Sequence, residues 1–415
     1  MKSNTERGGP PARQTRSASP SGTPGSAQAE PGHSLFAFDE TTCCALAQTH
    51  GTPIFAYHRP TAAAQYQRLR AALPDRVRIA FAVKSNPHAE LLKVFAGLGA
   101  SFDCASGGEL SRVAALGLPQ GMTFYAGPGK RDAELAQALA QGARIQAEGW
   151  EDLERLDALA TGPLAVNLRV HPASGADESN RIIGGTGPSA FGVDEEELPS
   201  LLERASRLHH VRIQGLHVFA ASNQRSAQAL LSTHAMVLGM ALRLHREHGL
   251  DLEQIDLGGG LGVPYSESET PLDVEALGQG LKALLEAHPW FKGELILEPG
   301  RFMSASCGVY LAKVVRVKES RGTRFIILEG GVNHLLRPLL TGEPFPVKVL
   351  GKSGALRPAT LAGPLCTSLD RLGDMPLPEV APGDLLAFGT VGAYGYTEAM
   401  GEFLSHPRPP EVWVG

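Results

Sequence analysis

Eight short apolar segments alternate with helix-like segments between roughly residues 76 and 300. Eight strand–helix units in about 225 residues match the size and rhythm of a TIM barrel. A doubly wound open sheet shares this alternation, so periodicity alone leaves the choice open. The expected strands are Val77–Val83, Ala100–Ala105, Thr123–Ala126, Ala143–Ala147, Leu164–Val170, Ile213–Phe219, Gln254–Leu257 and Glu294–Leu297. The expected helices between them include Ala89–Gly97, Gly108–Leu116, Asp132–Gln141, Trp150–Ala160 and Glu195–Arg207.

Polar residues and glycines follow the strands where the strands end. They are Lys84, Asp103, Arg169, His217, the run Gly258-Gly259-Gly260, and Glu298. In a barrel, the C-terminal ends of all strands converge on one mouth, and the active site lies there. Six such positions at one rim favour a barrel with a functional site.

The segments outside this region differ in composition. Residues 1–34 are rich in Ser, Pro, Gly and Ala, which predicts a disordered tail. A short strand near Ile54 lies in the segment 35–60, and a helix is expected from Thr61 to Leu73. After Arg301 the pattern becomes all-β. We therefore expect a barrel over 61–301 and a C-terminal β-domain over 302–415, completed by the N-terminal strand. Its expected strands are Val309–Val317, Arg324–Leu328, Ala359–Leu361, Asp384–Phe388 and Val412–Val414.

Charge and cysteine usage exclude several classes of partner and compartment. The net charge is -5 without a basic cluster, which argues against nucleic acid as the main partner. No apolar run is long enough to span a membrane, and no signal peptide opens the chain. The five cysteines form no CxxC pair, so we expect a cytoplasmic protein with reduced thiols. The pairs His209-His210 and His245/His248 lack a third ligand, and we expect no metal.

Lys84 closes an apolar strand immediately before a Ser-Asn-Pro turn. Burying an ammonium is costly, so the residue needs an explanation. One interpretation is that its head group reaches the surface at the strand end. The other is an amine whose pKa is lowered by desolvation, so that it can attack an aldehyde and form a Schiff base. The residue and its neighbours leave both interpretations open.

Seven motifs occur in one order along the chain. They are Phe81–Asn86, Phe102–Leu110, His217 with Ser222, Asp256–Gly260, Glu298–Arg301, Gly363–Cys366 and Gly392–Gly395. As a set they resemble the fold-type III pyridoxal-phosphate (PLP) decarboxylases, the family that includes the diaminopimelate and eukaryotic-type ornithine decarboxylases. The resemblance extends from about Phe38 to the C-terminus and implies PLP as the cofactor and an amino acid as the substrate.

The resemblance also implies roles for individual residues. Lys84 holds the aldehyde of PLP, and Glu298 keeps the pyridine nitrogen protonated because a nearby opposite charge raises the pKa of that nitrogen. His217 stacks on the ring. The remaining cofactor contacts are Asp103, Arg169, Ser222, Gly258, Gly259, Gly260, Gly300, Arg301 and Tyr394, of which the three consecutive glycines bring backbone N–H groups close to the phosphate.

In the family, the cysteine at position 366 belongs to the active site of the neighbouring subunit. It protonates the substrate carbon after carbon dioxide leaves. The resemblance therefore implies an obligate homodimer with two shared active sites, in which Cys366 is catalytic together with Lys84.

The sequence departs from the family where the substrate's far end is recognised. An acidic residue normally follows the cysteine and binds a distal ammonium, but here the residue is Thr367, a neutral hydroxyl that cannot provide a counter-charge. Arg337 is kept where diaminopimelate enzymes bind a carboxylate, while Thr341 replaces a family tyrosine. The expected substrate contacts are Arg301, Arg337, Thr367 and Tyr394, and Arg337 with Thr367 predicts a distal acid or amide.

These departures resemble the subgroup that acts on modified amino acids in biosynthetic clusters. Its substrates include citryl-diaminopropionate in siderophore assembly and carrier-protein-linked glutamyl groups. The alternatives are a diaminopimelate decarboxylase of lysine biosynthesis, a PLP racemase, and an inactive decarboxylase-like binding protein. Racemases of the alanine type place an arginine where Glu298 stands, and an inactive relative would not be expected to retain Lys84, Glu298 and Cys366.

Overall fold

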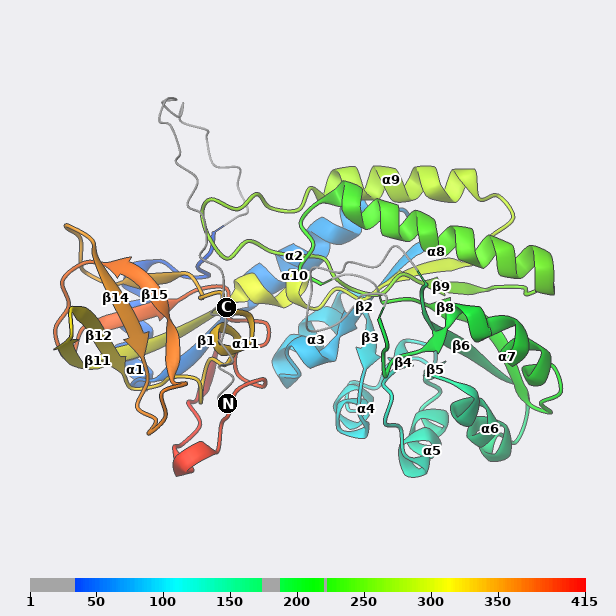
Figure 1. Cartoon of the computed structure of the whole chain (residues 1–415), viewed down its shortest axis with the longest axis horizontal. Helices are drawn as coiled ribbons and strands as arrows, with labels where there is room; N and C mark the ends of the chain where they lie inside the picture. The colour runs from blue at the N-terminus through cyan, green and yellow to red at the C-terminus, as the bar shows by residue number, and fades with distance from the viewer. Residues whose placement is uncertain (1–33, 174–186, 220–221) are drawn as a thin grey trace, which may run out of the picture. The chain divides into compact units, whose positions relative to one another are not determined.

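The computed structural model describes residues 34–173, 187–219 and 222–415 (Figure 1). Eight parallel strands form a sheet that closes on itself, because β5 pairs with β6 as well as with β4. The eight are β2 (Val77–Ala82), β3 (Ser101–Cys104), β4 (Thr123–Tyr125), β5 (Arg144–Ala147), β6 (Leu164–His171), β8 (Val211–His217), β9 (Gln254–Asp256) and β10 (Glu294–Leu297). The predicted barrel is therefore confirmed, and the alternative of an open sheet is excluded.

The helices lie outside the barrel strands and cover them (Figure 1). They are α2 (Arg59–Ala72), α3 (Ala89–Gly97), α4 (Gly107–Ala114), α5 (Asp132–Ala140), α6 (Trp150–Leu159), α7 (Leu198–Ala205), α8 (Ala227–His248), α9 (Val274–Ala287) and the short α10 (Arg301–Ser304). Ser106 and Asp273 cap α4 and α9 by accepting backbone N–H groups of the first turn. The sequence analysis did not assign α8 or α9.

Short elements complete this part of the chain. A single 3-10 turn, η1 (Val83–Ser85), carries Lys84 directly after β2. The others are β7 (Val193–Asp194), η2 (Glu195–Glu197) and η3 (Ala305–Cys307).

The N-terminal strand joins the C-terminal sheet, as the sequence predicts. β1 (Ile54–His58) pairs antiparallel with β11 (Gly308–Ser320) and parallel with β17 (Glu411–Val414). The helix α1 (Glu40–His50) precedes it and packs against it. The rest of the sheet contains β12 (Thr323–Leu328), β13 (Val347–Val349), β14 (Arg357–Ala362), β15 (Arg371–Leu377) and β16 (Leu385–Phe388), with α11 (Arg337–Thr341) and η4 (Phe403–Ser405) in its connections.

Two of these strands, β13 and β15, were not predicted. Both are terminal in the order of hydrogen-bonded strands. β15 contains Gly373, Asp374 and Pro376, residue types that are depleted in strands and tolerated mainly at sheet edges. The alternation of apolar and polar residues that predicts a strand is therefore weak in β15.

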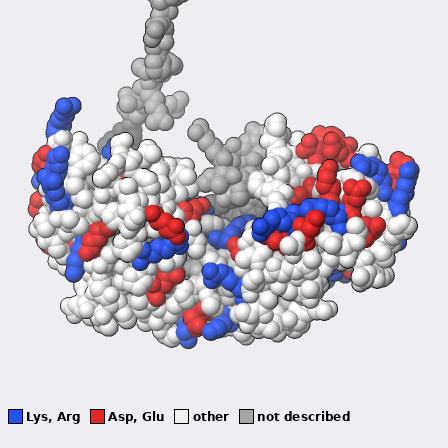
Figure 2. Space-filling model, turned by 90° about the horizontal axis from the view of Figure 1, so that it is seen from below, with Lys and Arg blue, Asp and Glu red and all other residues white. Residues whose placement is uncertain are grey.

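Several sequence expectations stay predictions. The disordered tail over 1–34 lies outside the described residues except for Ser34. The exact domain boundaries are not tested. Within the described ranges, no helix is long and apolar enough to cross a membrane, and on the face in Figure 2 basic and acidic side chains lie beside one another. All five cysteines are free thiols. Cytoplasmic location and the exclusion of nucleic acid are not tested further.

Candidate functional site

A cavity of about 460 Å³ lies at the C-terminal ends of the barrel strands. It is lined partly by residues that the sequence analysis selected, and partly by others such as Glu398, which it did not. The predicted members are Lys84, Ser222, Gly260, Glu298, Gly300, Arg301, Arg337 and Tyr394. The chain thus brings residues from the barrel and from the segment after residue 302 to one place.

Lys84 reaches into this cavity from η1, with 35% of its side chain exposed. Its Nζ atom lies 3.8 Å from Oδ2 of Asp103 and 5.3 Å from the centroid of the Phe219 ring. Burial lowers the pKa of Lys84, but the negative charges of Asp103, Tyr394 and Glu298 raise it more, and the net pKa lies above its ordinary value. Desolvation therefore lowers this pKa as expected, but the net pKa of Lys84 is raised because the Asp103 carboxyl lies beside the amine.

Three buried side chains meet next to Lys84. Nε2 of His217 lies 3.5 Å from Oε2 of Glu298, and Asp256 lies close enough for all three groups to fall within 4.8 Å of one another. Asp256 accepts hydrogen bonds from Gln146 Nε2 at 2.7 Å and from the Gly258 N–H at 2.9 Å. Sequence reasoning missed Asp256 as a site member, although it precedes the glycine run.

The two carboxyls respond oppositely to their surroundings. Burial and the charge of Glu298 raise the pKa of Asp256 well above its ordinary value. Burial also acts to raise the pKa of Glu298, but His217 and Lys84 outweigh it and hold that pKa below its usual range. Asp256 is therefore protonated while Glu298 is ionised, because two neighbouring buried carboxylates repel each other when both are charged.

Several buried polar atoms of this centre have no hydrogen-bond partner in the part of the chain that the structure describes. Among the described residues, Oε1 of Glu298, Oδ1 of Asp103 and both ring nitrogens of His217 have no hydrogen-bond partner. Leaving buried polar atoms unpaired costs free energy, so such groups are usually satisfied. The three histidine and carboxylate side chains also have metal-ligating atoms, and the prediction of no metal stays a prediction.

The glycines lie where any larger residue would collide with neighbouring backbone. A Cβ atom at Gly259 would lie 2.6 Å from the carbonyl oxygen of Glu298, and one at Gly258 would lie 2.8 Å from that of Val218. Gly258 and Gly260 also have φ angles of +69° and +95°, which residues with side chains rarely adopt. The backbone after β9 can therefore approach a ligand closely.

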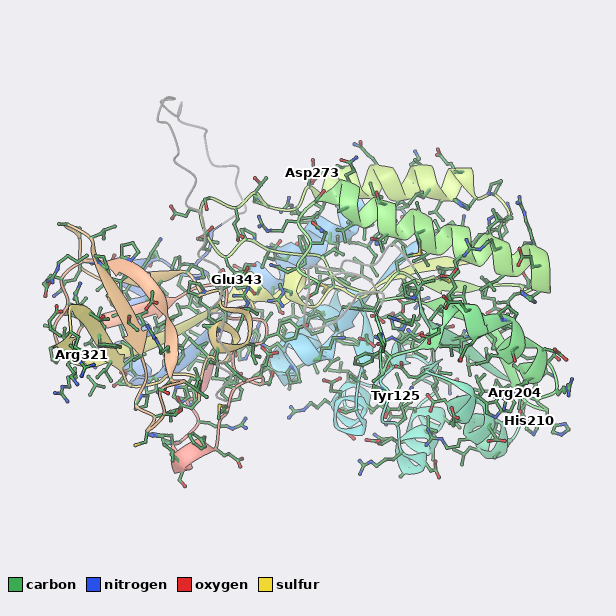
Figure 3. All side chains as sticks on the ribbon, in the orientation of Figure 1. Tyr125, Arg204, His210, Asp273, Arg321 and Glu343 are labelled. Atoms are coloured by element: carbon green, nitrogen blue, oxygen red, sulfur yellow. The ribbon has the colours of Figure 1, made fainter. Side chains whose placement is uncertain are left out.

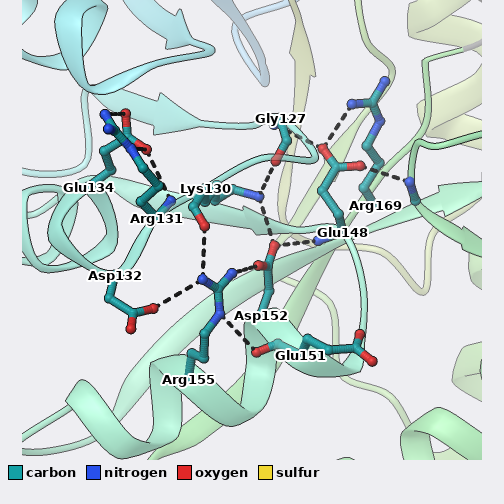
Figure 4. Close-up of polar contacts among 11 residues, drawn as sticks. Gly127, Lys130, Arg131, Asp132, Glu134, Glu148, Glu151, Asp152, Arg155 and Arg169 are labelled. Carbon is teal, nitrogen blue, oxygen red and sulfur yellow. Dashed lines mark hydrogen bonds and ion pairs between the residues drawn. The ribbon is translucent and has the colours of Figure 1, made fainter.

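Arg169 does not line the cavity; a buried ion network holds it instead (Figure 4). Its Nη1 atom donates to Glu148 Oε1 at 2.9 Å, and the other oxygen of Glu148 accepts the N–H of Gly192. Next to it, Lys130 pairs with Asp152 at 2.8 Å. These pairs neutralise the buried charges at the ends of β4, β5 and β6.

Two arginines, Arg301 and Arg337, also line the cavity. Arg301 donates a hydrogen bond to the hydroxyl of Tyr265, and its guanidinium lies 4.8 Å from the centroid of the Tyr394 ring. Arg337 stacks on Tyr265 at 3.7 Å and pairs with Glu343 at 2.7 Å. Glu343, labelled in Figure 3, follows α11 and is largely exposed.

Cys366 and Thr367 are not part of this cavity. They lie in the connection between β14 and β15, where Cys366 is exposed and Thr367 is half-buried. Asp370 fixes this connection by accepting the backbone N–H groups of Leu365 and Val332. A single chain therefore does not bring these two predicted site residues to Lys84.

Known proteins are similar to this chain in sequence and in fold. Residues 61–305 match the model of the family described as pyridoxal-dependent decarboxylase, pyridoxal binding domain. The chain is 34% identical over 375 residues to diaminopimelate decarboxylase of Pseudomonas aeruginosa, covering 89% of each protein. It is 29% identical over 391 residues to the L-glutamyl-[BtrI acyl-carrier protein] decarboxylase of Niallia circulans, covering 90% and 91%. The crystal structure of diaminopimelate decarboxylase from Helicobacter pylori with L-lysine superposes with a TM-score of 0.82 at 28% identity, covering 89% and 93%.

Proposed function

This chain belongs to the pyridoxal-dependent decarboxylase family and is a PLP-dependent amino-acid decarboxylase, and from that premise we propose a substrate whose far end carries no free ammonium. The observation that supports this most is the neutral Thr367 beside Cys366, where the family resemblance requires an acid. Arg301 and Arg337 add two guanidinium groups to the cavity lining, which also contains Glu109 and Glu398. A distal acid, amide or acyl group can accept hydrogen bonds from these guanidinium groups, whereas a distal ammonium cannot.

The residues at the base of the cavity fit PLP. The unpaired Oε1 of the buried, ionised Glu298 suits a protonated pyridine nitrogen, and the imidazole ring of His217 offers a flat face beside it. We assign Lys84 to the aldehyde, and Gly258, Gly259, Gly260, Ser222 and Tyr394 to the phosphate. When bound, PLP accepts the electrons of the bond that breaks between the α-carbon and the carboxylate.

The proton balance of the reaction is assigned to this chain's own side chains. Asp103 lies 3.8 Å from the Lys84 amine and can share its proton while the substrate amine replaces that lysine. After carbon dioxide leaves, the α-carbon needs one proton. We assign this proton to the Cys366 thiol, as the family resemblance implies, and the product is the corresponding amine.

We propose that two copies of the chain share the site. Cys366 is exposed and lies outside the cavity that holds Lys84, which supports its delivery by a second copy. A C2 homodimer would place Cys366 and Thr367 of the partner subunit in each cavity.

Two kinds of relative support two candidate substrates. The Niallia circulans relative is named for a glutamyl group on a carrier protein, which has no distal ammonium. The Pseudomonas aeruginosa relative is named for diaminopimelate, and the retained Arg337 keeps that activity as the second candidate. Thr367 favours the carrier-linked glutamyl group over diaminopimelate. A role in a biosynthetic cluster, such as siderophore assembly, is part of the same proposal.

A substrate panel tests the proposal. The purified, PLP-loaded protein is incubated separately with diaminopimelate, lysine, ornithine, citryl-diaminopropionate and a carrier-linked glutamyl group, and released carbon dioxide is measured. We expect turnover of acylated or carrier-linked substrates only. Faster turnover of diaminopimelate or ornithine would contradict the proposal while keeping the decarboxylase chemistry.

A further inference from the structure

One acidic side chain in the cavity has no role in the account above. Glu398 lies four residues after Tyr394 and lines the cavity together with Lys84, Arg301 and Arg337. Burial raises its pKa, and the two arginines act in the opposite direction. A half-buried carboxyl that lines a substrate cavity is a candidate for ligand recognition.

Neither neighbouring arginine is paired with Glu398. The guanidinium of Arg337 donates to both the carbonyl oxygen and the side chain of Glu343, at 3.0 and 2.7 Å. Arg301 donates to the Tyr265 hydroxyl. Within the ranges that the structure describes, no ion pair joins Glu398 to another residue, so its oxygens can accept a hydrogen bond from a ligand.

The same wall offers a free donor. Nε of Arg337 is buried and has no hydrogen-bond partner among the described residues. Arg337 and Glu398 therefore line one cavity, one with an N–H that has no partner and the other with a carboxyl that forms no ion pair within the described part of the chain. A buried pair of this kind selects a ligand that satisfies both, because a ligand that satisfies only one leaves the other unpaired.

We propose that Glu398 determines specificity by accepting the N–H of an amide at the far end of the substrate, while Arg337 donates to the amide carbonyl. This inference rests on the proposed function and narrows its substrate class. A distal carboxylate would lie beside the carboxyl of Glu398, which is also an acid, and a distal ammonium would face the guanidinium groups of Arg301 and Arg337. A secondary amide is neutral and carries one donor and one acceptor.

An amide and its ester isostere provide the test. Glutamine methylated on its side-chain amide nitrogen and the γ-methyl ester of glutamate both keep a free α-amine. They differ at the far end only in that the amide N–H of the first is an ester oxygen in the second. The wild-type holoenzyme should prefer the amide in kcat/KM by about 10- to 100-fold, the range expected when a hydrogen bond to a charged group is lost. Glu398→Ala should abolish this preference, and Glu398→Gln, which keeps an acceptor oxygen, should retain part of it.

Glu402→Ala is the matched control. Glu402 is exposed, lies four residues further along the same connection and does not line the cavity, so its removal should leave the preference unchanged. The visible absorbance of bound PLP shows that each variant is folded and loaded. It also separates a change in specificity from a loss of cofactor.

The outcomes separate this inference from the proposed function. Equal kcat/KM for amide and ester in the wild type, or a preference that survives in Glu398→Ala, would overturn the role of Glu398 and leave the proposed function intact. Carbon dioxide release only from substrates with a distal ammonium would overturn both.

Discussion

Nε2 of His217 lies 3.5 Å from Oε2 of Glu298, and each side chain is only 2% exposed. Glu298 stays ionised in this buried position because His217 and Lys84 offset the cost of desolvation. An ionised carboxylate with one unpaired oxygen can stabilise a cationic ring nitrogen. The chemistry of the site therefore depends on the charge of Glu298 as well as on its shape.

Glu298→Gln keeps the shape and removes this charge. We expect kcat for decarboxylation to fall by about 100- to 1000-fold, as for other losses of preorganised electrostatic stabilisation. Bound PLP, measured by its visible absorbance, should remain. Glu294→Gln is the control, because Glu294 lies at the other end of β10 and pairs with Arg78. A variant at 298 that keeps kcat within threefold of the wild type would contradict the assignment.

The shared site predicts complementation between two inactive variants. Lys84→Ala and Cys366→Ala homodimers should each lose most activity. If the subunits are mixed and reassorted, about half of the dimers are mixed, and each mixed dimer has one intact site of two. Activity should therefore recover to about one quarter of the wild type. No recovery, with reassortment confirmed by mass, would place both residues in the same subunit's site.

The sequence predicted those parts of the site that follow the barrel strands. Lys84, Glu298 and Gly260 reach the cavity because the C-terminal end of a parallel strand points to the barrel mouth. Local pattern did not predict Asp256, since one aspartate before a glycine run has no periodic signal. The net upward pKa shift of Lys84 was not predicted either, because it depends on the distance to Asp103, which only the closed barrel sets.

Tertiary contacts also explain the other omissions. β15 is an edge strand whose residues carry little strand propensity, so pairing with β14 defines it. Glu398 follows a turn at Tyr394, whose backbone N–H bonds to the carbonyl of Ser85 and ties this segment to the Lys84 turn. That long-range hydrogen bond brings Glu398 to the cavity.

The packing of α9 on α2 predicts a large difference between two glycine substitutions. A Cβ atom at Gly278 in α9 would lie 1.9 Å from the carbonyl oxygen of Ala72, whereas one at Gly239 in α8 would meet nothing within 4 Å. Gly278→Ala should lower the free energy of unfolding by about 1–3 kcal/mol through overpacking. Gly239→Ala should raise it by about 0.5–1 kcal/mol. Equal effects in chemical denaturation would refute this packing.

His234 predicts a loss of stability in mild acid. Burial in α8 lowers its pKa from 6.5 to about 4. Between these values the unfolded chain binds a proton that the folded chain does not, so the free energy of unfolding falls as the pH drops from 6.5 to 4. The loss is about 3 kcal/mol for this residue.

His234→Leu should make the dependence of unfolding free energy on pH shallower in that window, by up to about 1.4 kcal/mol per pH unit. His248→Leu, an exposed change in the same helix, should leave the slope as it is in the wild type. An unchanged slope in His234→Leu would show that this imidazole does not control acid stability.

A competition between matched substrates tests the proposed specificity most directly. Equal amounts of diaminopimelate, ornithine and the counterparts of each that are acylated on the distal amine are mixed with the PLP-loaded holoenzyme. The amine products are resolved by mass. We predict that the acylated amines form first, and that Thr367→Glu shifts product formation toward the substrates with a free distal ammonium. Preferential decarboxylation of free diaminopimelate or ornithine by the wild type would contradict the account.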